Sequence, residues 1–174
     1  AGVVLVARGR FIDERAAART ALHEIEGHAL PELRASASAL GLFKIGTRAG
    51  ADEQEGYALV LEERAGFLDA GRRAELGLRH LAARALHEGA SFVDACTLLL
   101  ERGASVEDGV RIAMRAHRGG ADGNGGRGRE RVYLGAYVRV SRAFLEDPTL
   151  EDVVSAGRVA VEAAPTLRPH RAPS

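Results

Sequence analysis

The chain has 174 residues, of which 46% are hydrophobic and 28% are charged, and this is the size and composition of one globular domain with a real core. The 24 basic and 24 acidic residues cancel, which argues against a nucleic-acid-binding protein and against binding to an anionic membrane surface. The single cysteine, Cys96, excludes an internal disulfide. No stretch approaches the ~18 apolar residues of a membrane span, and no signal peptide is visible, so we expect a cytoplasmic protein.

The first predicted element is a short strand at residues 3–6, where the chain is rich in valine. A helix is predicted to begin at Asp13, which suits the N-cap position, and to end near residue 30, just before Pro31. Residues 34–52 are small and polar, with three glycines, and indicate a loop or a brief helix. A second strong helix is predicted to begin near Glu53.

The rest of the chain is predicted to be helical, with elements at residues 72–87, 90–102, 105–117, 130–145 and 149–163. Ser105 suits the N-cap of the third of these. Residues 121–128 are dense in glycine and indicate a loop, and residues 164–174 contain three prolines and indicate a disordered tail. We therefore expect one domain over residues 1–163, of α+β class but predominantly α-helical.

Residues 22–28 contain two histidines that flank a glutamate, which is the ligand and base chemistry of a mononuclear zinc hydrolase. In zinc-protease helices the two histidines are four residues apart, about 40° around the axis. His23 and His28 are five residues apart, about 140° on an ideal helix, so a regular helix would not chelate. A one-residue π-bulge at the permissive Gly27, or an early break, would bring them to one face. The alternative is a polar helix with two incidental histidines.

A second acidic segment lies about a helix length downstream, at residues 53–58. A third zinc ligand from a separate helix is a recurring arrangement in single-zinc peptidases. Glu55 is the first candidate because Gly56 leaves room beside it for a metal, and Glu53 is the second. The alternative is an acidic helix N-terminus that only complements the helix dipole.

Five segments occur in the same order as in one known family: residues 11–28, 54–56, 88–92, 117–120 and 131–135. The chain resembles the family that contains the tubulin-detyrosinating MATCAP carboxypeptidases and bacterial proteins named for a QEGLA motif. The family's HExxxH zinc motif falls on residues 23–28, and its later glutamate ligand falls on Glu55. The resemblance implies a zincin-like metallopeptidase with a bulged HExxxH helix and Zn²⁺ bound by His23, His28 and Glu55.

The chain also departs from the family pattern. Tyr57 replaces the usual leucine, and residues 128–130 are Gly-Arg-Glu where the family usually has Thr-Lys-Asp. Arg129 keeps the positive charge but not the geometry of a lysine. Family members also carry a sizeable region before the strand at residues 3–6, so we expect this chain to be the catalytic part of a longer protein or a shortened relative.

The implied chemistry is hydrolysis by a metal-activated water. Zinc lowers the pKa of its bound water to ~7, and Glu24, beside the first histidine, then takes the proton as general base. Tyr133 or an arginine could stabilise the oxyanion. Arg118 and Arg129 could hold the terminal carboxylate of a peptide or protein substrate. For these last three residues the alternatives are a packed tyrosine and solvated surface arginines.

Two functions compete at this stage. The first is a zinc metallopeptidase, by resemblance a carboxypeptidase that removes a C-terminal residue from a peptide or protein. The second is a non-catalytic regulatory or binding protein that retains the fold, although the presence of Glu24 argues against it. Lys44 is the only lysine among the 24 basic residues, an arginine bias typical of a GC-rich bacterial genome. A bacterial source would make tubulin an unnatural substrate.

Overall fold

The computed structural model describes residues 13–118 and 129–171 of the chain. These residues group into two compact units: unit 1 comes from residues 1–68 and 136–174, and unit 2 comes from residues 69–135. The described residues contain helices and no strand, so the predominantly helical character is confirmed, whereas the α+β class is not. The predicted strand at residues 3–6 and the glycine-dense loop at residues 121–128 lie outside the described residues.

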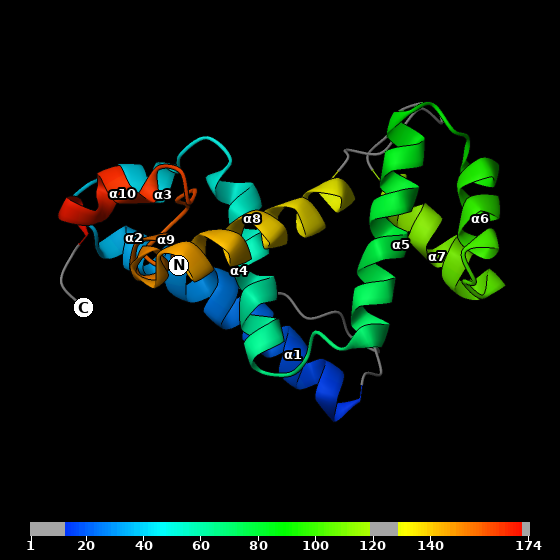
Figure 1. The fold of residues 1–174 in the computed structure, drawn as a ribbon, viewed down its shortest axis with the longest axis horizontal. Coiled ribbons are helices and arrows are strands. Elements are labelled where there is room, and N and C mark those ends of the chain that lie inside the picture. Colours follow the sequence, from blue (N-terminus) through cyan, green and yellow to red (C-terminus); the bar gives the residue numbers. More distant parts are fainter. Residues whose placement is uncertain (1–12, 119–128, 172–174) are drawn as a thin grey trace. The chain divides into compact units, whose positions relative to one another are not determined.

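Unit 1 is a set of packed helices (Figure 1). In chain order they are α1 (Glu14–Glu24), η1 (Ile25–Ala29), α2 (Leu30–Ala37), α3 (Leu42–Ile45), α4 (Gly50–Arg64), the larger part of α8 (Val132–Glu146), η3 (Pro148–Leu150), α9 (Glu151–Val154), α10 (Ala164–Leu167) and η4 (Arg168–His170). The predicted N-cap at Asp13 is confirmed, because its carboxylate accepts a hydrogen bond from the Ala16 amide. The core gathers side chains of α4, α8 and the C-terminal segment around Phe43 and Tyr57.

The first helix does not end before Pro31, as predicted, but continues to Ala37. The five residues of η1 form a π-helical turn between α1 and α2. Pro31 therefore falls in the first turn of a new α-helical segment, where a missing backbone N–H is tolerated. The predicted bulge is present, and it explains why the proline does not stop the helix.

The predicted helix at residues 149–163 is wrong, because regular α-helix ends at Val154. Beyond it, the backbone amides donate to other parts of unit 1. The Arg158 amide donates to the Phe43 carbonyl at 3.0 Å, and the Val161 amide donates to the Glu53 carboxylate at 2.7 Å. Gly157 has its α-carbon so close to Phe43 that a β-carbon would lie 2.4 Å from the Phe43 carbonyl oxygen. These long-range contacts replace the helical hydrogen bonds.

The prediction of a disordered tail at residues 164–174 does not hold for residues 164–170. This segment forms α10 and η4, and residues 172–174 lie outside the described residues. Ala164 and Leu167 are buried in the core of unit 1. Pro165 sits in the first turn of α10, where its fixed φ favours the helix, so the proline was a helix start rather than a sign of disorder.

Two glycines allow helices of unit 1 to cross closely. A β-carbon at Gly27 would lie 2.5 Å from the β-carbon of Ala58, so η1 lies almost in backbone contact with α4. A β-carbon at Gly56 would lie 2.5 Å from the backbone carbonyl of Ala136, so α4 and α8 cross at that point. The first crossing places the histidine-bearing helix against the helix that carries Glu55.

Unit 2 contains α5 (Ala70–His87), α6 (Phe92–Glu101), α7 (Val106–Ala116) and η2 (Arg129–Arg131), followed by the first turn of α8. These bounds lie within two residues of the predicted helices. The N-cap predicted at Ser105 is confirmed, and Ser91 forms a capping box with Asp94. Its core joins the facing sides of α5, α6 and α7.

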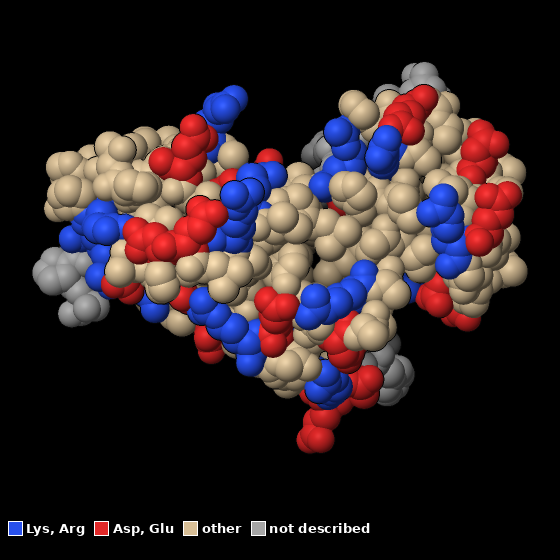
Figure 2. Space-filling view, viewed as in Figure 1, with Lys and Arg blue, Asp and Glu red and all other residues tan. Residues whose placement is uncertain are grey.

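The surface carries mixed charge. On the face drawn in Figure 2, acidic and basic side chains lie interspersed within each unit. This agrees with the formal net charge of zero. Among the described helices, none combines the length and the hydropathy that crossing a membrane requires.

Candidate metal centre

The π-helical turn places His23 and His28 side by side. His23 lies in the last turn of α1 and His28 lies within η1. Their ring centroids are 5.1 Å apart in an edge-to-face arrangement. The wider turn of a π-helix accounts for this, since five residues then advance about one turn instead of about 1.4 turns. The two imidazoles therefore face the same volume.

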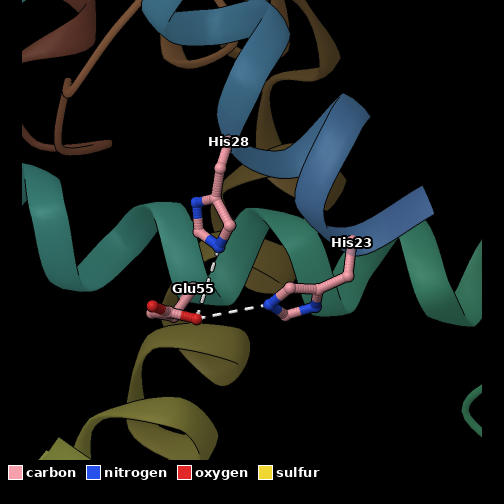
Figure 3. A group of neighbouring side chains, drawn as sticks. All are labelled: His23, His28 and Glu55. Carbon is pink, nitrogen blue, oxygen red and sulfur yellow. Dashed lines mark ion pairs between the residues drawn. The ribbon is translucent and has the colours of Figure 1, made fainter. Parts of the chain in front are cut away.

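Glu55, on α4, supplies a carboxylate to this volume (Figure 3). Its Oε2 atom lies 3.4 Å from Nε2 of His23 and 3.5 Å from Nε2 of His28. The Glu55 side chain is 5% exposed, whereas the His23 and His28 side chains are 12% and 26% exposed. The buried carboxylate of Glu55 thus lies against two imidazoles. Of the three side chains, that of His28 is the most exposed to solvent.

The three side chains could hold one metal ion. One ligand atom from each of His23, His28 and Glu55 lies within 4.8 Å of the other two. In a tetrahedral zinc site with metal–ligand distances of about 2.0–2.1 Å, two ligand atoms are about 3.3–3.4 Å apart. The two measured nitrogen–oxygen separations, 3.4 and 3.5 Å, match that edge length. The donor set of two imidazoles and one carboxylate is also one that catalytic zinc sites use.

His23 lies between two buried carboxylates. Its Nδ1–H donates to Oε1 of Glu62 at 2.8 Å, and its Nε2 atom faces Glu55. Burial by itself lowers the pKa of His23, but the hydrogen bonds and charges of Glu55 and Glu62 overcome this and raise the pKa to about 9. The surroundings of this ring therefore stabilise a positive charge, whether a proton or a metal ion supplies it.

The predicted general base, Glu24, is the last residue of α1 and is exposed. In the part of the chain that the structure describes, its carboxylate forms no hydrogen bond or ion pair. It directly follows His23 and is therefore free to take a proton. Its catalytic role stays a prediction.

The second ligand candidate, Glu53, is engaged elsewhere. Its carboxylate accepts hydrogen bonds from Arg139 at 2.8 Å and from the Val161 amide at 2.7 Å. Glu53 thus anchors α8 and the C-terminal segment, and it is absent from the ligand group. The space beside Gly56, which the sequence analysis assigned to a metal, is occupied by the backbone of α8 at Ala136.

The predicted substrate residues belong to unit 2, whereas the ligand group belongs to unit 1. Arg118 follows α7 and is exposed. Tyr133 lies in the first turn of α8, under the guanidinium of Arg79, which is 4.8 Å from the ring centroid. The side chain of Arg129 lies outside the described residues. The roles of Tyr133, Arg118 and Arg129 stay predictions.

Tyr133 belongs to a cluster of charged residues in unit 2. Glu130 accepts hydrogen bonds from Arg79 and, at 2.6 Å, from Arg115. Burial by itself raises the pKa of Glu130, but the two guanidinium groups outweigh it and hold the pKa below its usual 4.5. Arg79 is only 5% exposed, and its ion pair with Glu130 joins α5 to η2 within unit 2.

The sequence interpretation missed Glu62. This residue is 1% exposed and contacts the ligand His23. The available signal was its spacing, since a residue seven positions after Glu55 lies on the same face of a helix, two turns further on. A second acidic residue at that position is unusual on a face that is otherwise buried.

A π-bulged helix that carries two histidines, crossed by a helix that offers a buried glutamate, defines a helical protein with a candidate mononuclear metal centre. The sequence matches the family described as microtubule-associated tyrosine carboxypeptidase (MATCAP) over residues 1–173. The chain belongs to this family. Comparisons with curated proteins and with solved structures gave no match.

Proposed function

We propose that this protein is a zinc-dependent carboxypeptidase that removes a C-terminal residue from a peptide or protein. The observation that carries the proposal is the convergence of His23, His28 and Glu55, in which both nitrogen–oxygen separations suit a tetrahedral metal ion. Membership in a family described as a tyrosine carboxypeptidase supports the reaction class and a peptide or protein substrate. The arrangement we propose is zincin-like, with the HExxxH motif on a bulged helix and the third ligand on α4.

Each residue would have a defined task. Zinc, held by His23, His28 and Glu55, would lower the pKa of water to ~7 and polarise the scissile carbonyl. Glu24 accepts the proton of the attacking water and passes it to the leaving amine. Its exposed carboxylate, which has no protein partner among the described residues, suits this exchange.

A carboxypeptidase must also recognise the terminal carboxylate. We propose Arg118 and Arg129 for this task, since a guanidinium can bind a carboxylate through two hydrogen bonds. We propose Tyr133 as the hydrogen-bond donor to the oxyanion. These three assignments rest on the chemistry of the side chains and, for the two arginines, on their positions either side of the glycine-dense segment at residues 121–128.

The test compares three variants with the unchanged protein. Glu55→Ala removes a ligand, Glu24→Gln removes only the base, and Glu26→Gln is the matched control, since Glu26 is an exposed glutamate two residues along the same helix. Metal content is measured after purification and dialysis. Each protein is then assayed on peptides that differ only in the C-terminal residue, including tyrosine, and on the same peptides with an amidated C-terminus.

The proposal predicts one zinc per chain in all forms except Glu55→Ala. It also predicts that Glu24→Gln retains zinc but trims peptides at least about 10²-fold more slowly, whereas Glu26→Gln behaves like the unchanged protein. Amidated peptides should resist cleavage. Stoichiometric zinc without turnover on any peptide would favour the non-catalytic binding protein, and absence of bound metal from the unchanged protein would refute the metal centre.

A further inference from the structure

Glu62 contacts His23 through Nδ1, the ring nitrogen that does not face Glu55. Glu55 and Glu62 are seven residues apart on α4 and therefore lie on one face, two helical turns apart. Each faces one ring nitrogen of His23: Glu55 lies 3.4 Å from Nε2, and Glu62 lies 2.8 Å from Nδ1. The ring is thus contacted at both nitrogens by side chains of a single rigid helix.

The hydrogen bond to Glu62 determines which nitrogen of His23 carries the proton. A carboxylate accepts hydrogen bonds and does not donate them, so the 2.8 Å contact with Glu62 requires a proton on Nδ1 of His23. The contact of Nε2 with Glu55 is longer, at 3.4 Å, so Nε2 is the nitrogen that lacks a proton when the ring is neutral. The lone pair of a neutral ring then lies on Nε2, the atom that faces Glu55. A metal ion requires a lone pair at that atom.

His28, the second histidine, differs from His23 in its contacts within the described residues. His28 contacts Glu55 through Nε2, and within the described residues no carboxylate pairs with its Nδ1 atom. Its side chain is also twice as exposed as that of His23, at 26% against 12%. The carboxylate at Glu62 is 1% exposed, and burying such a group is unfavourable unless a specific partner compensates it. His23, at 2.8 Å, is one such partner of the Glu62 carboxylate.

We infer that Glu62 is a positioning residue of the metal centre, which fixes the tautomer and the orientation of His23 so that Nε2 faces the metal. The inference rests on the proposed metal centre for its functional meaning. Carboxylate partners of this kind orient ligating histidines and raise their basicity, and their removal typically weakens metal binding about 10–100-fold.

The experiment compares Glu62→Gln with Glu63→Gln. Glu63 is the next residue on α4 and accepts a hydrogen bond from the Tyr137 hydroxyl at 2.6 Å, so the control removes a similar charge from a similar contact away from His23. Zinc affinity is measured by competition with a chelator at constant pH. We expect about a 10-fold or greater loss for Glu62→Gln and less than about a 3-fold change for Glu63→Gln.

A second readout needs no metal. Nitrogen-15 chemical shifts of the His23 ring, assigned with His23→Ala, report which nitrogen is protonated once the ring is neutral. We expect the Nδ1–H tautomer in the unchanged protein and a loss of this preference in Glu62→Ala. The Nε2–H tautomer in the unchanged protein would overturn the inference, as would equal zinc affinities of the two glutamine variants. If the unchanged protein binds no zinc, the metal proposal fails, while the tautomer measurement still decides the role of Glu62.

Discussion

His23 and His28 are five residues apart in the sequence, yet their ring centroids lie 5.1 Å apart because a π-helical turn runs between them. On a regular α-helix the two side chains would diverge by about 140°. The extra residue of the π turn is therefore what makes this motif able to chelate. Glu24 directly follows the first histidine and is the last residue of α1, immediately before this turn.

The two histidines should differ in their contribution to the stability of the metal-free protein. His23→Ala removes the N–H that the buried Glu62 accepts, so we expect a loss of about 1–3 kcal/mol in the free energy of unfolding. His28→Ala removes a side chain that is 26% exposed, and we expect a loss below about 1 kcal/mol. Urea unfolding in the presence of a chelator measures the free energy of unfolding of both variants. Equal losses in His23→Ala and His28→Ala would contradict the predicted difference between the two histidines.

The close approach of η1 to α4 should not tolerate a side chain at Gly27. Gly27→Ala places a β-carbon 2.5 Å from that of Ala58, so we expect destabilisation by about 1–3 kcal/mol and weaker zinc binding, because η1 carries His28. Gly77→Ala is the control, since Gly77 lies within α5 with no atom within 4 Å of an added β-carbon. That change should stabilise by up to about 1 kcal/mol. If Gly27→Ala were at least as stable as the unchanged protein, η1 and α4 would have room for a β-carbon at this position, and the close crossing would be contradicted.

The ion pairs of Glu130 should make unit 2 sensitive to acid. The pKa of Glu130 is lower in the folded protein than its usual 4.5, so its contribution to stability is present above 4.5 and is lost as the pH falls through the lowered folded value. Glu130→Gln leaves the buried Arg79 without its charge partner, and we expect a loss of about 3 kcal/mol at neutral pH. This difference should shrink below pH 4.5.

Glu107→Gln is the control for that measurement, because Glu107 is an exposed glutamate of α7 with no ion pair among the described residues. Its effect on the free energy of unfolding should stay within about 0.5 kcal/mol. A difference between Glu130→Gln and the unchanged protein that does not depend on pH would mean that the carboxylate charge is not the cause.

Glu53 should anchor the segment that follows α9. Glu53→Ala removes the acceptor of the Val161 amide and the partner of Arg139, so amide hydrogen exchange at Val161 should become at least about 10-fold faster. Asp52→Ala changes the neighbouring, exposed acidic residue and should leave that rate unaltered. Unchanged protection of Val161 in Glu53→Ala would show that other contacts hold the segment.

Local signals predicted much of the fold. Asp13 and Ser105 act as N-caps as expected, because capping depends only on a side chain and the amides three residues ahead. The family match agrees with the resemblance that residues 23–28 and 54–56 carry. The segment at residues 149–163 was mispredicted because its amides bond to Phe43 and Glu53, which are more than a hundred residues away in the chain.

The amino-acid sequence by itself determined the helical character of the described chain and the two histidine ligand candidates, His23 and His28. It also left two glutamates, Glu53 and Glu55, as competing third ligands. Only the tertiary structure decided between them, because the crossing of η1 over Ala58 directs Glu55 toward both histidines, while Glu53 turns to Arg139. The same crossing pairs Glu62 with His23. Residue spacing sets which side chains share a helix face, but contact between two helices depends on how closely their backbones can approach.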